Sequence, residues 1–473
     1  MDTPTPAPRV AGASAVVALV LVLSGAGCGG AAPDAVVLIV VDAVRADHLG
    51  AYGYPRPTSP NIDARAADGL LFERAYTTSP WTLPAFGSLL TGRLPTGHAA
   101  GFEAEGDLAD GPSEVAAARR FLTLDPKLPT LAGILATHGF ATGAFVTNPF
   151  LHPRFGLERG FTHYDHHESS NTEVRRADVV TDLSLAWIEE QAGGPFFLLV
   201  HFFDPHLDYD APPPFRGRFA AAPGDEAGAP RPPLQGLWPI RNAVAELSAS
   251  QRDLIAAAYD EEIAFVDAEV GRLLAGIERR GLHERTLVIL TADHGEELFD
   301  HGGFEHGHAM YDEVLRVPLI LWGPGIEPGR EAVPVSLIDI LPTILDALGI
   351  EAAGDPAAAL PGISLLPPRS RPPAGQPPRP VIAEAPLYGP RTKAIVEWPY
   401  KAILDLESGE AQLFDLSADP GELDDLAAAR PEELRGLLGA LADRIAAATP
   451  GESAAAELDD ELLRRLRALG YIR

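Results

Sequence analysis

The chain is poor in cysteine and lysine, and each shortage excludes some kinds of structure or site. Cys28 is the only cysteine among 473 residues, so an intrachain disulfide framework is excluded. The three lysines, at positions 127, 393 and 401, lie away from the motifs described below, so histidine and arginine must supply positive charge there. The apolar run at residues 15–23 has nine residues, whereas a membrane-spanning helix needs about 20. With 46% hydrophobic residues, the chain can form a large globular enzyme domain and a small second one.

Acidic residues outnumber basic ones, and the formal net charge is −29. An acidic surface repels a polyphosphate backbone, which argues against nucleic acid as a partner. The same charge disfavours anionic substrates at long range. A bound metal ion would have to reverse the sign of the potential locally. We therefore expect a cationic site within an acidic protein.

The first 28 residues have the features of an export signal. Arg9 precedes the apolar run, and small residues lead to Cys28. This arrangement resembles a bacterial lipoprotein cleavage site, where the cysteine becomes lipidated, although Gly25 stands where a leucine is usual. A plain secretory signal and an inert tail are the alternatives. We expect an exported protein, either periplasmic or membrane-anchored as a lipoprotein through Cys28.

Three apolar runs in the sequence are each followed directly by polar residues. The runs cover residues 36–41, 196–203 and 286–291, and the polar residues after them are Asp42, Asp204, Asp293 and His294. Unbroken runs of this kind predict parallel strands that are covered on both faces. The predicted fold class is α/β, with a mostly parallel central sheet between helices. Because ligands bind at the carboxyl edge of such sheets, the polar residues indicate a site there.

The C-terminal part of the chain has a different pattern. A proline-rich segment at residues 360–380 precedes short strand-like runs at 393–396, 400–404 and 412–416. These runs, joined by turn signals, predict a small antiparallel sheet. We divide the chain into a signal segment (1–28), a catalytic domain (34–370), a C-terminal subdomain (380–447) and a helical tail (452–473).

Residues 79–92 carry the most informative motif, Ser-Pro-Trp-Thr-Leu-Pro-Ala-Phe-Gly-Ser-Leu-Leu-Thr-Gly. This segment resembles the nucleophile segment of the sulfatase family in the alkaline-phosphatase superfamily, and the resemblance implies an alkaline-phosphatase-like core. Thr82 stands two residues before Pro84 and ten before the last glycine of the motif, the register of the family nucleophile. Sulfatases usually have there a cysteine or serine that is oxidised to formylglycine, with an arginine at the position of Phe86. Ser79 is an alternative serine, but it is out of register.

The resemblance implies that Asp42, Asp293 and His294 bind one divalent metal ion. Many sulfatases have a second aspartate where this chain has Ala43, and often an asparagine in place of His294. Losing a carboxylate and gaining an imidazole favours Mn²⁺ or Zn²⁺ over Ca²⁺, which remains an alternative. A second metal ion bound with Asp204 is left open. The metal would activate the hydroxyl group of the nucleophile.

Histidines supply the other expected catalytic groups. His206 resembles the family histidine that contacts the transferred group, and His306 lies about where relatives carry a lysine or histidine acid. We expect these two residues to stabilise the transferred group and to protonate the leaving group. Other residues of these motifs have less specific expected roles. His308 could be a neighbouring acid, an orienting residue or a ligand of a second metal ion, and His301 could lie at the surface or behind the residues that contact the substrate. We expect Arg45 and Asp47 to be structural, and Asn148 to be a turn residue or a donor in the pocket.

These residues predict a metal-dependent hydrolase of sulfate or phosphate esters that acts on a sulfated or phosphorylated small molecule or glycan. Threonine cannot release sulfate through a formylglycine hemiacetal, and relatives with threonine at this place include phosphodiesterases and envelope phosphoryl transferases. Either activity is therefore an alternative. A non-catalytic, sulfatase-like glycan-binding protein is a third hypothesis, based on Ala43 and Phe86. The oligomeric state is left open.

Overall fold

The computed structural model describes residues 1, 32–103, 120–167, 175–191, 193–219, 247–351, 360–367 and 379–468. It divides the chain into Met1–Gly30 and one compact unit, Ala31–Arg473. The expected export signal and Cys28 lie outside the described residues, apart from Met1. Among the residues described, none of the helices has the length and apolar character needed to cross a membrane. The division into domains made from the sequence stays a prediction.

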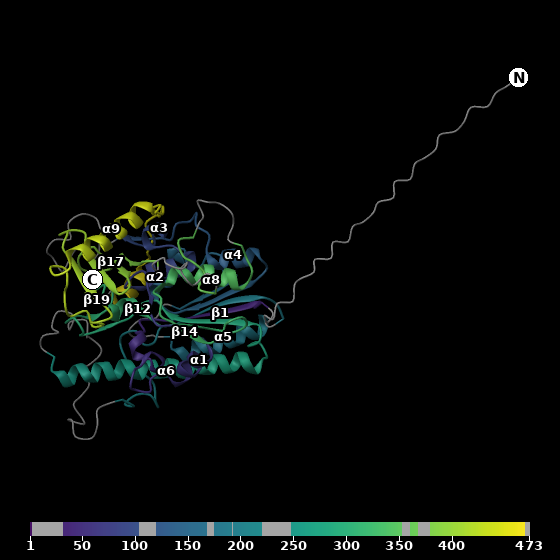
Figure 1. Ribbon diagram of the computed structural model, residues 1–473. Helices are drawn as coiled ribbons and strands as arrows, with labels where there is room; N and C mark the ends of the chain where they lie inside the picture. Colours follow the sequence, from purple (N-terminus) through teal and green to yellow (C-terminus); the bar gives the residue numbers. More distant parts are fainter. Residues whose placement is uncertain are drawn as a thin grey trace. The chain divides into compact units, whose positions relative to one another are not determined.

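The core of the compact unit is an eight-stranded sheet (Figure 1). Its strands lie in the order β14 (Gly329–Glu331), β2 (Leu70–Phe72), β13 (Leu319–Trp322), β9 (Thr286–Ala292), β1 (Ala35–Val41), β8 (Phe196–Phe202), β6 (Ala141–Val146) and β7 (His163–His166). Strand β1 pairs in parallel with β8 and β9, whereas β13 is antiparallel to both of its neighbours. Every residue of β1, β8 and β9 is buried, as their unbroken apolar runs predict. The mostly parallel α/β architecture is confirmed.

Helices cover both faces of this sheet (Figure 1). One face carries α1 (Pro60–Asp68), α5 (Ala177–Gln191) and α6 (Ala249–Arg279), and the other carries α2 (Thr82–Thr91), α4 (Leu131–Thr137) and α8 (Ile340–Ala347). Helix α6 begins at a capping box in which the Ser248 side chain accepts from the backbone N–H of Gln251. The helices shield the central strands from water on both faces of the sheet. Polar side chains can therefore gather only at the ends of these strands.

Shorter elements complete the compact unit. A three-stranded sheet joins β12 (Arg316–Val317), β3 (Ala75–Tyr76) and β15 (Val335–Ser336), and hairpin-like pairs join β10 (Glu297–Leu298) to β11 (Phe304–Glu305) and β4 (Gly101–Glu103) to β5 (Arg120–Leu122). Short helices are α3 (Pro95–His98), α7 (Asp312–Leu315), η1 (Ala46–His48), η2 (Gly50–Tyr52), η4 (Pro149–Leu151), η5 (Pro153–Phe155) and η8 (Leu337–Asp339).

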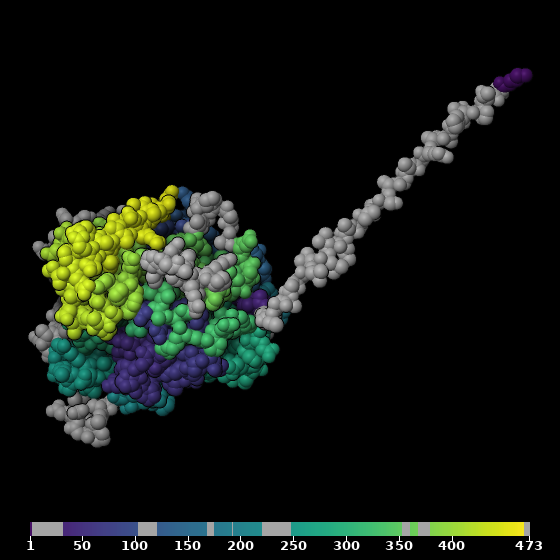
Figure 2. Space-filling view, viewed as in Figure 1, coloured from purple at the N-terminus to yellow at the C-terminus, as the bar shows by residue number. Residues whose placement is uncertain are grey.

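The predicted C-terminal sheet is antiparallel, in the order β16 (Val381–Ala383), β17 (Thr392–Glu397), β18 (Tyr400–Asp405) and β19 (Ala411–Asp415). Alternate residues face opposite ways: Ile395 joins Leu437 and Leu441 of α9 (Pro431–Ala447), whereas Val396 joins Tyr76 in a second apolar cluster. The sheet is therefore buried on both faces, between α9 and the main body. Figure 2 shows this piece in yellow-green to yellow on one side of the compact unit, and α10 (Asp460–Ala468) follows it.

Candidate active site

The three expected metal ligands meet at the carboxyl edge of the central sheet. Asp42 follows β1, Asp293 and His294 follow β9, and these strands pair in register with Val41 opposite Ala292. His294 Nε2 lies 3.5 Å from Asp42 Oδ1 and 3.5 Å from Asp293 Oδ2. All three side chains are buried. Parallel pairing thus brings together side chains that are about 250 positions apart in the chain.

The loop after β9 requires a glycine to hold His294 in place. Gly295 N donates to Val314 O at 2.7 Å. A Cβ atom at Gly295 would lie 2.1 Å from the carbonyl oxygen of Glu313, a distance that no side chain tolerates. The short helix α7 therefore packs directly against the backbone of the loop that carries Asp293 and His294.

Hydrogen bonds occupy one oxygen of each carboxylate and leave the other unsatisfied. Asp293 Oδ1 accepts from the backbone N–H groups of Ala43 at 3.3 Å and His294 at 3.0 Å, and Asp42 Oδ2 accepts from Asn148 Nδ2 at 2.8 Å. Across the described part of the chain, Asp42 Oδ1 and Asp293 Oδ2 have no hydrogen-bond partner, although both are buried. Buried, unsatisfied carboxylate oxygens are costly unless a cation neutralises them.

The spacing of the donor atoms fits a small divalent cation. His294 Nδ1 lies 2.9 Å from the carbonyl oxygen of Gly295, so Nδ1 carries the proton and the Nε2 lone pair faces the carboxylates. Thr82 Oγ1 lies 3.4 Å from the same Nε2. Metal–ligand distances of about 2.0–2.2 Å separate the ligands of a tetrahedral ion by about 3.3–3.6 Å. The separations of 3.4–3.5 Å observed here match that range.

A second imidazole, which the sequence analysis did not single out, also reaches the carboxylates. His201 Nε2 lies 3.4 Å from Asp42 Oδ2, and ligand atoms of Asp42, His201 and Asp293 all fall within 4.8 Å of one another. His201 lies within the apolar run of β8, where the sequence pattern predicts a core residue. The available signal was a histidine within a strand that is buried on both faces.

The two site carboxylates have pKa values shifted in opposite directions. Burial alone would raise the pKa of Asp42, but the imidazoles of His201, His206 and His294 lower it to about 2. Burial, reinforced by the negative charge of Asp42, raises the pKa of Asp293 to about 6. Repulsion between the two carboxylates therefore limits their joint ionisation, and a bound cation would relieve it.

Thr82 is the first residue of α2, but it does not cap the helix. The N-cap residue is Trp81, and no side-chain capping hydrogen bond is present. The Thr82 hydroxyl instead accepts from Asn148 Nδ2 at 3.2 Å. The Asn148 side chain is thus a donor in the pocket as well as a turn residue, because its Oδ1 accepts from Phe150 N at 2.9 Å. The alternative serine, Ser79, faces away and donates to Ala385 O at 3.2 Å.

His206 and His306 lie beside these residues. Their ring centroids are 5.1 Å apart, and that of His306 is 4.3 Å from that of His294. His306 Nδ1 contacts Glu296 Oε1 at 2.9 Å, and Tyr209 donates to Glu296 Oε2 at 3.0 Å. His206 Nδ1 lies 3.0 Å from Leu207 O, and burial lowers the pKa of this histidine. Both rings are therefore held by their Nδ1 atoms and present Nε2 as the other functional atom.

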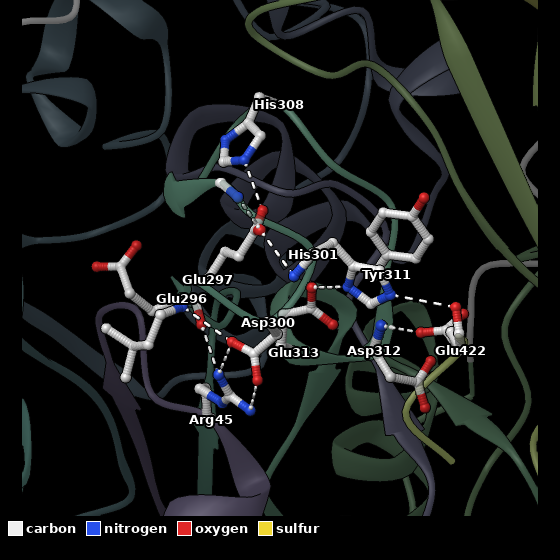
Figure 3. A network of polar contacts seen from close by, with 12 residues as sticks. Arg45, Glu296, Glu297, Asp300, His301, His308, Tyr311, Asp312, Glu313 and Glu422 are labelled. Atoms are coloured by element: carbon white, nitrogen blue, oxygen red, sulfur yellow. Dashed lines mark hydrogen bonds and ion pairs between the residues drawn. The ribbon is translucent and has the colours of Figure 1, made fainter. Parts of the chain in front are cut away.

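The remaining polar residues form a neighbouring network, which reaches Glu296 because Arg45 Nη1 donates to its carbonyl oxygen at 3.3 Å (Figure 3). Its contacts are His308 Nε2 to Glu297 Oε2 at 2.7 Å, His301 Nδ1 to Glu313 Oε1 at 2.7 Å, and Arg45 to Asp47 at 2.8 Å and to Asp300 at 2.7 Å. These pairings give His308, His301 and Arg45 structural partners.

Asp204 Oδ2 accepts from Ala177 N at 2.9 Å, and burial raises the pKa of this aspartate to about 6.

Comparison with known proteins places the chain in a family. The model of the Sulfatase family matches residues 34–350. The chain belongs to the sulfatase family. It is similar to arylsulfatase K of Bos taurus, with 27% identity over 85% of this chain and 80% of that protein, and to arylsulfatase K of Homo sapiens, with 26% identity over 84% and 79%.

Solved structures share the fold of this sulfatase-family chain. A 2-O GAG sulfatase has a TM-score of 0.70 at 20% identity, covering 93% of this chain and 96% of that one. A phosphonate monoester hydrolase from Silicibacter pomeroyi has a TM-score of 0.68 at 19% identity, covering 90% and 100%. These likenesses confirm the alkaline-phosphatase-like core with its additional C-terminal antiparallel sheet.

Proposed function

We propose that this sulfatase-family protein is a sulfuric ester hydrolase whose nucleophile is Thr82. The observation that carries the proposal is the position of Thr82 Oγ1, which lies 3.4 Å from His294 Nε2 and 3.2 Å from Asn148 Nδ2 in a buried site. The names of arylsulfatase K and of the 2-O GAG sulfatase refer to sulfate esters, which supports a sulfated small molecule or glycan as the substrate.

Asp42, Asp293 and His294 would hold a divalent cation, with Mn²⁺ or Zn²⁺ favoured by the mixed donor set. When bound, the cation supplies positive charge against the ester and lowers the pKa of the Thr82 hydroxyl. Asn148 donates to Thr82 Oγ1 and so stabilises negative charge on that oxygen. The backbone N–H groups of Thr82 and Leu83, in the first turn of α2, favour an anionic group at this place.

The reaction that we propose proceeds in two displacements. The Thr82 hydroxyl releases its proton to solvent, and its oxygen bonds to sulfur as the bond from sulfur to the alcohol oxygen breaks. His306 gives a proton to the departing oxygen. Glu296 orients His306 through Nδ1, and His206 contacts the transferred group. Water then attacks sulfur and gives a proton to His306, which restores the acid. The bond from sulfur to Thr82 breaks, the threonine oxygen takes a proton from solvent, and the products are sulfate and the free threonine side chain.

Phosphoryl chemistry is the second candidate function, either phosphodiester hydrolysis or phosphoryl transfer to an acceptor. Thr82 is the observation that favours it. A threonine cannot use the formylglycine route, whereas direct displacement suits a phosphoryl group equally well. The non-catalytic glycan-binding hypothesis is less favoured, because a binding protein has no need for an oriented Thr82 next to a potential metal site.

We also propose that the protein is exported and that Cys28 is lipidated. Mass spectrometry of the native N-terminus would check both proposals.

A panel of substrates separates these functions. The purified protein would be assayed on matched aryl sulfate, phosphate monoester and phosphodiester substrates with added Mn²⁺, Zn²⁺ or Ca²⁺. We expect sulfate release that falls by about 10³-fold or more in Thr82→Ala and that persists in Ser79→Ala, the matched control. Faster turnover of the phosphodiester would replace the sulfatase assignment with phosphodiesterase. No turnover of any substrate, with metal still bound, would favour the glycan-binding protein or a transferase.

A further inference from the structure

His201 is a buried imidazole that the proposed reaction does not use. It lies in β8, paired with Val40 of β1, and has no exposed surface. Its Nδ1 is 3.0 Å from Thr147 Oγ1, and the same hydroxyl lies 3.3 Å from the backbone carbonyl oxygen of His201. A hydroxyl has a single proton. If that proton goes to the carbonyl oxygen, Thr147 accepts from Nδ1–H, and Nε2 carries a lone pair.

In this tautomer the unprotonated Nε2 faces the carboxylates of Asp42 and Asp293. His201 Nε2 lies 3.4 Å from Asp42 Oδ2. It makes no hydrogen bond to any residue that the structure describes. Asp42 Oδ2 already accepts from Asn148 Nδ2 at 2.8 Å. The Phe86 ring packs edge-on against His201, with centroids 5.3 Å apart, and so keeps the imidazole in a dry environment. A buried lone pair without a donor is costly unless a cation occupies the space before it.

We propose that His201 is a ligand of the same metal ion as Asp42, Asp293 and His294. The resulting set has two carboxylates and two imidazoles, and the added imidazole makes up for the carboxylate that is missing at Ala43. Two nitrogen donors suit Zn²⁺ better than Ca²⁺. This inference depends on the metal site of the proposed function.

The test counts imidazole ligands directly. The purified full-length protein would be loaded with one equivalent of Zn²⁺ and studied by X-ray absorption, in which multiple scattering from imidazole rings gives their number. We expect two imidazoles in the wild type and one in His201→Asn. The Zn²⁺ affinity of this variant, measured by chelator competition, should fall by more than about 100-fold, the upper end for residues that only support a ligand. His138→Asn, which removes an exposed imidazole outside the site, is the matched control and should retain two imidazoles.

A single imidazole in the wild type, unchanged in His201→Asn, would overturn the proposal and make His201 a hydrogen-bond donor to Asp42. If the wild type binds none of Zn²⁺, Mn²⁺ and Ca²⁺, the metal dependence of the proposed function fails as well, so the two failures are distinguishable. If His201→Asn does not fold, as judged by circular dichroism, the imidazole count of the wild type decides alone.

Discussion

The carboxylate of Glu296 lies 2.9 Å from Nδ1 of His306, and both side chains are buried. The next residue, Glu297, contacts a different histidine, with 2.7 Å between its Oε2 and His308 Nε2. The two consecutive glutamates thus contact two different histidines near the β10–β11 hairpin. The register of this hairpin pairs Glu297 with Glu305. Glu296 fixes the ring that faces the proposed reaction centre, whereas Glu297 supports the hairpin itself.

Replacing Glu296 with glutamine should impair catalysis more than binding. The amide keeps the size of the side chain but loses the charge that balances a protonated His306. We expect kcat on an aryl sulfate to fall by about 10², with little change in KM. Glu297→Gln is the matched control, because it removes the neighbouring carboxylate and leaves His306 oriented. Equal losses of kcat in both variants would show that the hairpin, and not the Glu296–His306 contact, governs the activity.

Asn148→Asp tests the donor that faces Thr82. The substitution preserves the acceptor that caps Phe150 N, at 2.9 Å in the wild type. It replaces the N–H donor, 2.8 Å from Asp42 Oδ2 and 3.2 Å from Thr82 Oγ1, with an oxygen that repels both. We expect kcat to fall by about 10²-fold or more. A stable variant with unchanged steady-state kinetics would remove Asn148 from the mechanism.

Removing the metal should destabilise the protein, and the affinity for the metal should depend on pH. Chelation leaves Asp42 Oδ1 and Asp293 Oδ2 unsatisfied. At a metal concentration of 100 times Kd, its loss costs about 2.7 kcal/mol, which calorimetry would detect as a lower Tm. The pKa of Asp293 is about 6 in the metal-free protein, so below this pH a proton competes with the metal.

Zn²⁺ affinity should therefore fall at least about tenfold per pH unit as the pH drops below 6. Asp267→Asn serves as the control, because burial also raises the pKa of this aspartate to about 6, while its Oδ1 accepts from Ile62 N at 2.8 Å, away from the site. The control should keep the pH dependence of the wild type. A flat affinity between pH 7 and pH 5 would contradict the role of Asp293 as a ligand.

His301 should stabilise the fold only while it is protonated. Burial would lower its pKa, but the Glu313 carboxylate raises it from 6.5 to about 9. A histidine with a raised pKa adds stability that is fully present below pH 6.5 and is lost as the pH rises through 9. We expect the Tm advantage of the wild type over His301→Gln to shrink across this window. Glu313→Gln should remove the same pH-dependent difference, and a constant advantage from pH 6 to pH 10 would refute the pairing.

Part of the site could be predicted from local sequence. Asp42 and Asp293 follow apolar runs that had to be central strands, and the carboxyl ends of parallel strands meet at one edge. Thr82 was located by its register with Pro84. The same reasoning did not single out His201, because a histidine within an apolar strand looks like a core residue until its neighbours are known.

The sequence by itself therefore determined the fold class, the family resemblance and the elements that carry Asp42, Thr82 and Asp293, because strand periodicity and motif spacing are properties of the local chain. Only the tertiary structure decided which side chains meet. The Glu296–His306 contact depends on a hairpin, and the contact between His201 and Asp42 depends on the register of β8 against β1. Such contacts arise from packing between distant segments, and no local pattern encodes them.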